Sequence, residues 1–310
     1  MIIRPPTNWL RMLFVWDGSV LKTIVPQLLI ILAISLLAVY THGHLFGGKM
    51  PLDTVPFPLV GVSLAIFLAF RNNAAYARYV EARQIWGRIL IAARALMSQV
   101  INYLPADGDG FERKLFLQRL IAFVYALTHQ LRKTDPSEDL ARYLPKEEAR
   151  ELAGMHYIPI ALLDRLRLML ARAARRRQDG GGESESLLWL LDKQVSELSA
   201  AVGGCERISN TPIPFAYGVL LHRTVYLYCF MLPFGLVGDL GAVTPLVCVF
   251  VAYTLFALEA IAQEISEPFG TEPNCLALNA MTRNVERSLL EQCGEDVPEA
   301  LKPCDRYNIS

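Results

Sequence analysis

Charge is scarce in this sequence, and neither sign dominates. Charged residues make up 19% of the 310 positions, and 30 basic residues balance 30 acidic ones. A chain without net charge has no overall field that draws nucleic acid or acidic substrates toward it. The signatures of phosphate-binding loops, dinucleotide-binding turns, serine hydrolases and zinc peptidases are also missing. We therefore predict neither a nucleic-acid partner nor an enzyme.

Cysteine is equally sparse. The six cysteines include no Cys-x-x-Cys pair, and two of them lie inside apolar runs. This pattern fits neither a disulfide framework nor a zinc site. The histidines of His42-Gly-His44 have no further metal ligands near them in the sequence. We predict reduced cysteines in packing positions, no bound metal and no cofactor.

Long apolar runs, in contrast, are abundant. Hydrophobic residues make up 53% of the chain, and four runs stand out, at 24–40, 56–70, 213–237 and 243–261. A membrane-spanning helix needs roughly 17–25 mostly apolar residues. The second run is shorter than this, but it continues without a helix breaker into Arg71-Asn-Asn73. We predict an all-α membrane protein with four transmembrane helices, the second of which passes directly into a helical cytosolic domain.

Basic residues indicate which side of the membrane is cytoplasmic. The two outer loops of this topology contain a single lysine, Lys49, whereas five arginines follow the second run: Arg71, Arg78, Arg83, Arg88 and Arg94. Because lysine and arginine collect on the cytoplasmic side, we place both termini in the cytoplasm. The chain then divides into an N-terminal segment with two spans (1–70), a cytosolic helical region (71–211), two further spans (212–262) and a cytosolic C-terminal segment (263–310).

The region between the second and third spans carries helical patterns only. Apolar residues recur with helical period in 85–100, 116–131, 158–170 and 187–202, and one more helical stretch covers 277–291. No stretch alternates with period two, so we predict almost no sheet.

One apolar stripe lies on the second run. Val62, Ile66 and Phe70 are spaced i, i+4 and i+8, which places them on one face of a helix. Two interpretations remain open at this point. The stripe packs against neighbouring spans, or it lines a hydrated path, as the loss of apolar character after Phe70 indicates.

Several motifs, in this order, resemble the bestrophin family in its bacterial branch. They include Phe70-Arg-Asn-Asn-Ala-Ala-Tyr-Ala-Arg78, Trp86-Gly87, Thr211-Pro-Ile-Pro-Phe-Ala-Tyr217 and Glu264-Ile-Ser-Glu-Pro-Phe-Gly270. The matching positions to which we assign a structural role are Arg71, Asn73, Tyr76, Arg78, Glu81, Trp86, Pro212, Pro214, Arg223, Glu264, Pro268 and Gly270.

The resemblance implies a homopentameric channel in the bacterial inner membrane, with a pore lined by the second transmembrane helix of each subunit. Val62, Ile66 and Phe70 would form three apolar rings in its neck, and Ile208 or a near neighbour would form a constriction at the cytosolic exit. The permeant species would be small monovalent ions that pass passively, with cations favoured over anions. An anion (chloride) channel of the same fold is the alternative, and a membrane-anchored scaffold or enzyme is the alternative of another class.

Calcium activation, known for animal members of the family, is not expected for this chain. Animal members bind calcium through an acidic run after the Pro-Phe-Gly motif. The corresponding Thr271-Glu-Pro-Asn-Cys275 offers only Glu272 and Asn274, which are too few oxygen ligands for calcium. The bacterial pattern often has an aspartate where this chain has Cys275.

Overall fold

A single long helix connects the two ends of the molecule. The computed structural model describes residues 8–13, 15–16, 18–45, 48–49, 55–104, 111–176 and 183–303. Helix α3 (Pro56–Tyr103) contains 48 residues, which corresponds to about 72 Å at 1.5 Å per residue. Its prolines stand in the first turn, where a missing N–H has no cost, and no proline interrupts the rest. The predicted continuation of the second apolar run into a polar helix is therefore confirmed.

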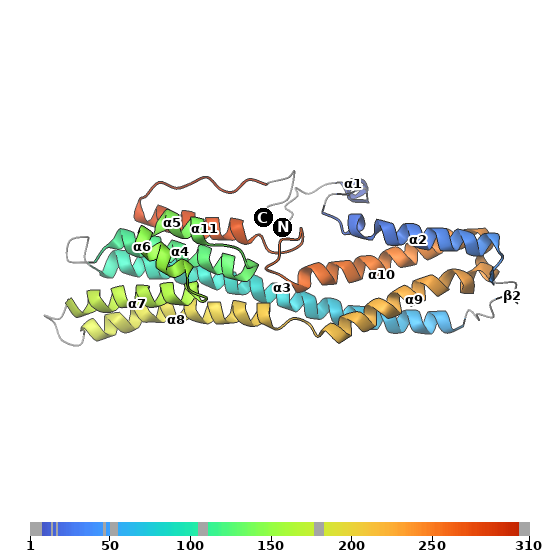
Figure 1. The fold of residues 1–310 in the computed structure, drawn as a ribbon, viewed down its shortest axis with the longest axis horizontal. Coiled ribbons are helices and arrows are strands. Elements are labelled where there is room, and N and C mark those ends of the chain that lie inside the picture. Colours follow the sequence, from blue (N-terminus) through green and yellow to red (C-terminus); the bar gives the residue numbers. More distant parts are fainter. Residues whose placement is uncertain are drawn as a thin grey trace.

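The other helices surround α3 in two groups (Figure 1). The first group contains α2 (Leu21–Tyr40), α9 (Phe215–Leu240) and α10 (Thr244–Ser266), with the short α1 (Trp9–Leu13) near the start of α2. The second group contains α4 (Arg113–Arg132), α5 (Ser137–Tyr143), α6 (Lys146–Ala153), α7 (Ile158–Arg176), α8 (Glu183–Asn210) and α11 (Leu278–Cys293). In the described part of the chain, the strands are β1 (His44–Leu45) and β2 (Gly48–Lys49), a two-residue antiparallel pair. The all-α prediction is confirmed.

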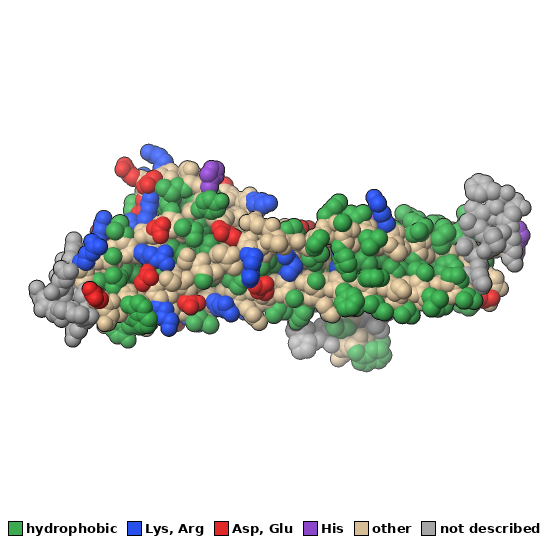
Figure 2. Space-filling view, turned by 90° about the horizontal axis from the view of Figure 1, so that it is seen from below, with side chains coloured by type: hydrophobic (Ala, Val, Ile, Leu, Met, Phe, Trp, Pro, Cys, Tyr) green, Lys and Arg blue, Asp and Glu red, His purple; other side chains and the backbone are tan. Residues whose placement is uncertain are grey.

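The first group forms the apolar half of the molecule. Three described helical stretches, Leu21–Tyr40, Pro56–Tyr103 and Phe215–Ser266, are long and apolar enough to cross a membrane. The third contains α9 and α10, which lie side by side and are joined by a 3-10 turn at Gly241–Val243. Gly241 has a positive φ of 51°, which glycine adopts without steric cost. Hydrophobic side chains cover this half, and charged side chains gather on the other (Figure 2).

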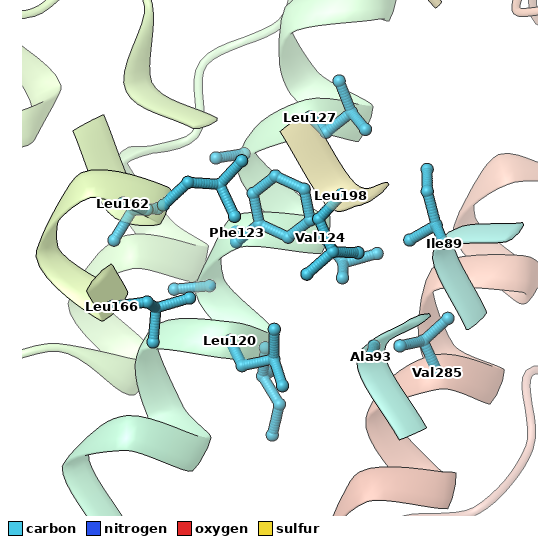
Figure 3. Close-up of a cluster of buried hydrophobic side chains, with 14 of the residues drawn as sticks. Ile89, Ala93, Leu120, Phe123, Val124, Leu127, Leu162, Leu166, Leu198 and Val285 are labelled. Atoms are coloured by element: carbon cyan, nitrogen blue, oxygen red, sulfur yellow. The ribbon is translucent and has the colours of Figure 1, made fainter. Parts of the chain in front are cut away.

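The second group encloses the larger hydrophobic core. Figure 3 shows side chains from five helices meeting in it: Ile89 and Ala93 of α3, Leu120, Phe123, Val124 and Leu127 of α4, Leu162 and Leu166 of α7, Leu198 of α8, and Val285 of α11. Cys205 also belongs to this core, and burial raises the pKa of its thiol to about 12, so the thiol stays protonated at neutral pH. The periodic segments predicted from the sequence all lie in these helices. The short helices α5 and α6 were not predicted, because one or two turns show no periodicity.

A buried carboxylate ties α11 to its neighbours. Glu286 is 2% exposed and accepts a hydrogen bond from the Tyr125 hydroxyl at 2.6 Å. Its carboxylate also accepts hydrogen bonds from the Tyr143 hydroxyl and from Arg283 Nη1, the latter at 2.8 Å. Burial, together with the hydrogen bond to Glu286, raises the pKa of both tyrosines above the ordinary value. Because these groups come from α4, α5 and α11, the cluster fixes three helices against one another.

The packing of α9 on α3 depends on a glycine, and this predicts a strong effect of Gly235→Ala. A Cβ atom at Gly235 would lie 2.2 Å from Phe57 Cε2, whereas a Cβ at Gly238 meets no atom within 4 Å among the described residues. We expect Gly235→Ala to destabilise the protein by about 1–3 kcal/mol, as overpacking does. Thermal unfolding in detergent measures this, with Gly238→Ala as the control in the same helix. Equal melting temperatures for the two variants would contradict the prediction.

Candidate functional site

The apolar stripe of α3 points out of the protomer. Val62, Ile66 and Phe70 are 62%, 50% and 61% exposed, respectively. Leu64 and Leu68, on another face of the same helix, are buried in the core that α3 forms with α2, α9 and α10. Helix α3 therefore packs into its own protomer through Leu64 and Leu68 and leaves the stripe free.

The same face becomes polar farther along the helix. At 3.6 residues per turn, Asn73, Gln84 and Arg88 lie within about 40° of Ile66 around the helix axis, and all three are exposed. Arg88 forms no ion pair within the part of the chain that the structure describes. One exposed line thus runs from the apolar stripe to a farther part of the helix that carries polar residues, together with the exposed Ile91. This change favours a hydrated path over packing against lipid.

A buried arginine sets the rotation of α3 about its axis. The Arg71 side chain is buried, and its Nη2 donates to Gln263 Oε1 at 2.7 Å. Its Nη1 lies 3.5 Å from Glu259 Oε1, which also accepts from His222 Nδ1 at 2.8 Å. Burying a charge is tolerated when it is paired and hydrogen-bonded. Because Arg71 follows Phe70 directly, its anchorage to α10 directs the stripe away from α10.

Arg78 joins the apolar half of the molecule to the half that carries the larger core. Its guanidinium donates to three backbone carbonyls: Ser266 O at 3.0 Å, Ile208 O at 2.6 Å, and Thr211 O. Burial lowers the pKa of Arg78, and the charge of Glu267 partly opposes this effect. The carbonyls belong to the ends of α8 and α10 and to the loop before α9. Arg78 therefore holds together three segments that are far apart in the sequence.

The expected exit constriction at Ile208 disagrees with the structure. The Ile208 side chain is 3% exposed and belongs to the larger hydrophobic core, and its carbonyl accepts a hydrogen bond from Arg78. A ring residue must expose its side chain to the path, so Ile208 does not fit this role. The family resemblance placed it there without information on which face of α8 is buried.

The remaining motif residues are structural or exposed. Glu81 pairs with Arg207, Trp86 is fully enclosed in the larger hydrophobic core, and Glu264 accepts from Asn274 Nδ2 at 2.7 Å. Asn73, Tyr76, Pro212, Pro214 and Arg223 are exposed, Pro268 is buried, and Gly270 donates its N–H to Glu267 O. The sequence analysis missed Glu259 and Gln263 as partners of Arg71. Their i, i+4 spacing at the end of an apolar run was the available signal.

The turn after the Pro-Phe-Gly motif does not fit a calcium site. Asn274 is engaged with Glu264, and the Cys275 thiol donates to Glu264 O at 3.4 Å and to Glu267 O at 3.2 Å. Glu272, which is exposed, is the one carboxylate of this turn, whereas calcium takes six to eight oxygens. In the described ranges there is also no group of three histidine, cysteine, aspartate or glutamate residues placed to hold a metal. That calcium does not activate the protein stays a prediction.

Comparison with known families decides the identity of this architecture. The family described as bacterial/fungal bestrophin protein matches residues 1–291. The chain belongs to the bestrophin family. The resemblance seen in the motifs is thereby confirmed over nearly the whole sequence, and the fold is that of an all-helical membrane protein.

Known proteins are similar to this chain over most of its length. A protein of Ralstonia nicotianae named voltage-dependent anion channel-forming protein is 44% identical over 95% of both chains. The voltage-dependent anion channel-forming protein YneE of Escherichia coli K12 is 42% identical over 100% of both chains. A crystal structure of a bestrophin homolog from Klebsiella pneumoniae is 41% identical, with a TM-score of 0.82, and covers 88% of this chain and 99% of its own.

Family membership and these names indicate an ion channel rather than an enzyme. The names refer to anion channels, which does not support the preference for cations that we expected from the sequence.

Proposed function

We propose that this bestrophin-family chain forms a passive channel for small monovalent anions, with α3 of each subunit lining the pore. The exposed stripe of Val62, Ile66 and Phe70, continued by polar residues on the same face, carries this proposal. The names of the similar proteins support anions as the permeant species. A single protomer cannot enclose a path with one helix, so the pore is built from several copies. Five is the number that the family resemblance implies.

The proposed topology has four spans in the bacterial inner membrane. They are α2, the first part of α3 to Phe70, α9 and α10, with both termini in the cytoplasm. Residues 1–70 and 212–262 then form the membrane part, and 71–211 and 263–310 the cytosolic part. In this topology the membrane run of α3 can be short, because its polar continuation faces the hydrated pore rather than lipid.

The mechanism follows from the chemistry of the stripe. Apolar rings offer no ligands to a dehydrated ion, so they open and close a path by wetting and dewetting, and ions pass with their water. Such rings do not discriminate between charges. Selectivity then comes from charged groups next to them, and the unpaired Arg88 on the same face attracts anions into the cytosolic part of the path.

Reversal potentials in planar bilayers test this function. With purified protein in asymmetric sodium chloride, we expect currents that reverse close to the chloride equilibrium potential. Reversal close to the sodium potential would refute the anion assignment but keep the channel. No current from correctly assembled protein would refute the channel itself, and a mass far from five protomers would refute the pentamer.

A further inference from the structure

We propose that the pocket at the cytoplasmic end of α9 binds the phosphate group of an anionic phospholipid, with Arg223 as the principal cation. The pocket has a volume of about 480 Å³ and lies between α9, α10 and the loop that precedes α9. Phe215, Val219, His222 and Arg223 line it from α9, and Glu259 and Gln263 line it from α10. The inference rests on the membrane-spanning assignment of α9 made above, and not on ion conduction.

Arg223 lies on an apolar face. Leu220, Arg223 and Leu227 are spaced i, i+3 and i+7, so they share one side of α9, and both leucines are exposed. Phe215, at the start of the helix, is exposed too. This face has the composition of a surface that contacts acyl chains, and Arg223 is the charged residue within it.

Arg223 lies within the membrane-spanning part of α9, and its long side chain extends toward headgroup level. It comes eight residues after Phe215, the first residue of α9, which is about 12 Å into the membrane-spanning part. A charge in the hydrocarbon is costly unless it is paired or reaches the interface. The Cα–Cβ bonds of a helix tilt toward its N-terminus, which is the cytoplasmic end of α9 in the proposed topology. The long side chain therefore extends toward the phosphates of the inner leaflet.

Glu259, a carboxylate of the pocket, is already engaged by other side chains: it accepts from His222 at 2.8 Å and lies 3.5 Å from Arg71. Glu267 also lines the pocket, and its charge partly opposes the lowering of the Arg78 pKa by burial. Arg223 forms no hydrogen bond or ion pair with another residue that the structure describes. An anion from outside the protomer is the missing partner.

Phosphate chemistry and the apolar walls together indicate a lipid. A guanidinium binds phosphate oxygens through two parallel N–H···O hydrogen bonds, and the exposed ring of His222 lies in the same pocket. A free phosphate would satisfy Arg223 but would leave Leu220, Leu227 and Phe215 without a partner. A phospholipid satisfies both, because its phosphate meets Arg223 while its chains cover the apolar face.

Lipid retention measured on the full-length protein tests the proposal. The protein is reconstituted in equal parts of phosphatidylglycerol and phosphatidylcholine, and the lipids that stay bound are counted by native mass spectrometry. We expect wild type to enrich phosphatidylglycerol about fivefold, the scale of one basic residue near an anionic surface. Arg223→Gln is expected to bring the ratio to that of the mixture. Arg175→Gln, which removes an exposed arginine of α7, is the control and keeps the enrichment.

Three outcomes would overturn the proposal. Unchanged enrichment in Arg223→Gln removes Arg223 from the site. Equal thermal stabilisation by inorganic phosphate or glycerol phosphate in pure phosphatidylcholine assigns the site to free anions. Loss of subunits from Arg223→Gln in phosphatidylcholine alone assigns Arg223 to a contact between copies. Arg223→Lys keeps the charge and replaces Arg223→Gln in the test if the latter does not fold. Enrichment of phosphatidylglycerol that falls at least about twofold in this variant supports binding of the phosphate by two parallel guanidinium N–H donors. Unchanged enrichment overturns that binding mode. Because this experiment measures bound lipid and not current, its result does not depend on whether the protein conducts ions.

Discussion

Replacing Phe70 by alanine is expected to raise the conductance of the reconstituted channel severalfold, and Ile66→Ala is expected to act in the same direction. Each side chain projects from the exposed face of α3, and in the proposed assembly every subunit contributes one copy. Removing a ring of large apolar groups widens the neck and lowers the cost of wetting it. A decrease of about 1.4 kcal/mol in the permeation barrier corresponds to a tenfold increase in rate. Single-channel recording measures the effect.

Phe67→Ala provides the matched control for this prediction. Phe67 is also an exposed phenylalanine of α3, but it lies about 100° around the helix from Ile66 and therefore outside the stripe. We expect the conductance of the Phe67→Ala channel to equal that of wild type. Unchanged currents in both Ile66→Ala and Phe70→Ala would remove the stripe from the pore. An equal increase in Phe67→Ala would show a general loosening of the helix instead.

The largest effect on stability is expected from Glu286→Ala. The variant leaves Arg283 and the hydroxyls of Tyr125 and Tyr143 without their common acceptor in a buried site. Removing one partner of a buried charge pair costs about 3–5 kcal/mol, because the remaining charge stays desolvated. We expect the cytosolic half to unfold at a clearly lower temperature, as measured by circular dichroism of the purified protein.

Glu291→Ala in the same helix separates this effect from a general loss of acidic charge. Glu291 is exposed near the end of α11, and surface substitutions of this kind usually change stability by no more than about 0.5 kcal/mol. A melting temperature of Glu286→Ala equal to that of Glu291→Ala would show that the buried cluster does not stabilise the fold.

Much of this architecture could be predicted because it depends on local patterns. The apolar runs predicted the helices α2, α9 and α10, and the absence of a breaker after Phe70 predicted the unbroken α3. These inferences work because the length and composition of a segment set its cost in lipid or in water. The ordered motifs predicted the family. The two short helices between 137 and 153 were not predicted, because one or two turns show too little periodicity.

The tertiary structure decided which faces are buried, and this changed two roles. The family resemblance made Ile208 a candidate for a constriction, but the packing of α8 encloses its side chain. Spacing also left open whether Val62, Ile66 and Phe70 pack or line a path, and the burial of Leu64 and Leu68 shows that α3 packs through another face. The partners of Arg71 lie 188 and 192 residues away along the chain. Local sequence thus determined which segments are helices and which are apolar. The rotation of each helix was decided by contacts between distant residues, because burial and pairing depend on all the helices at once.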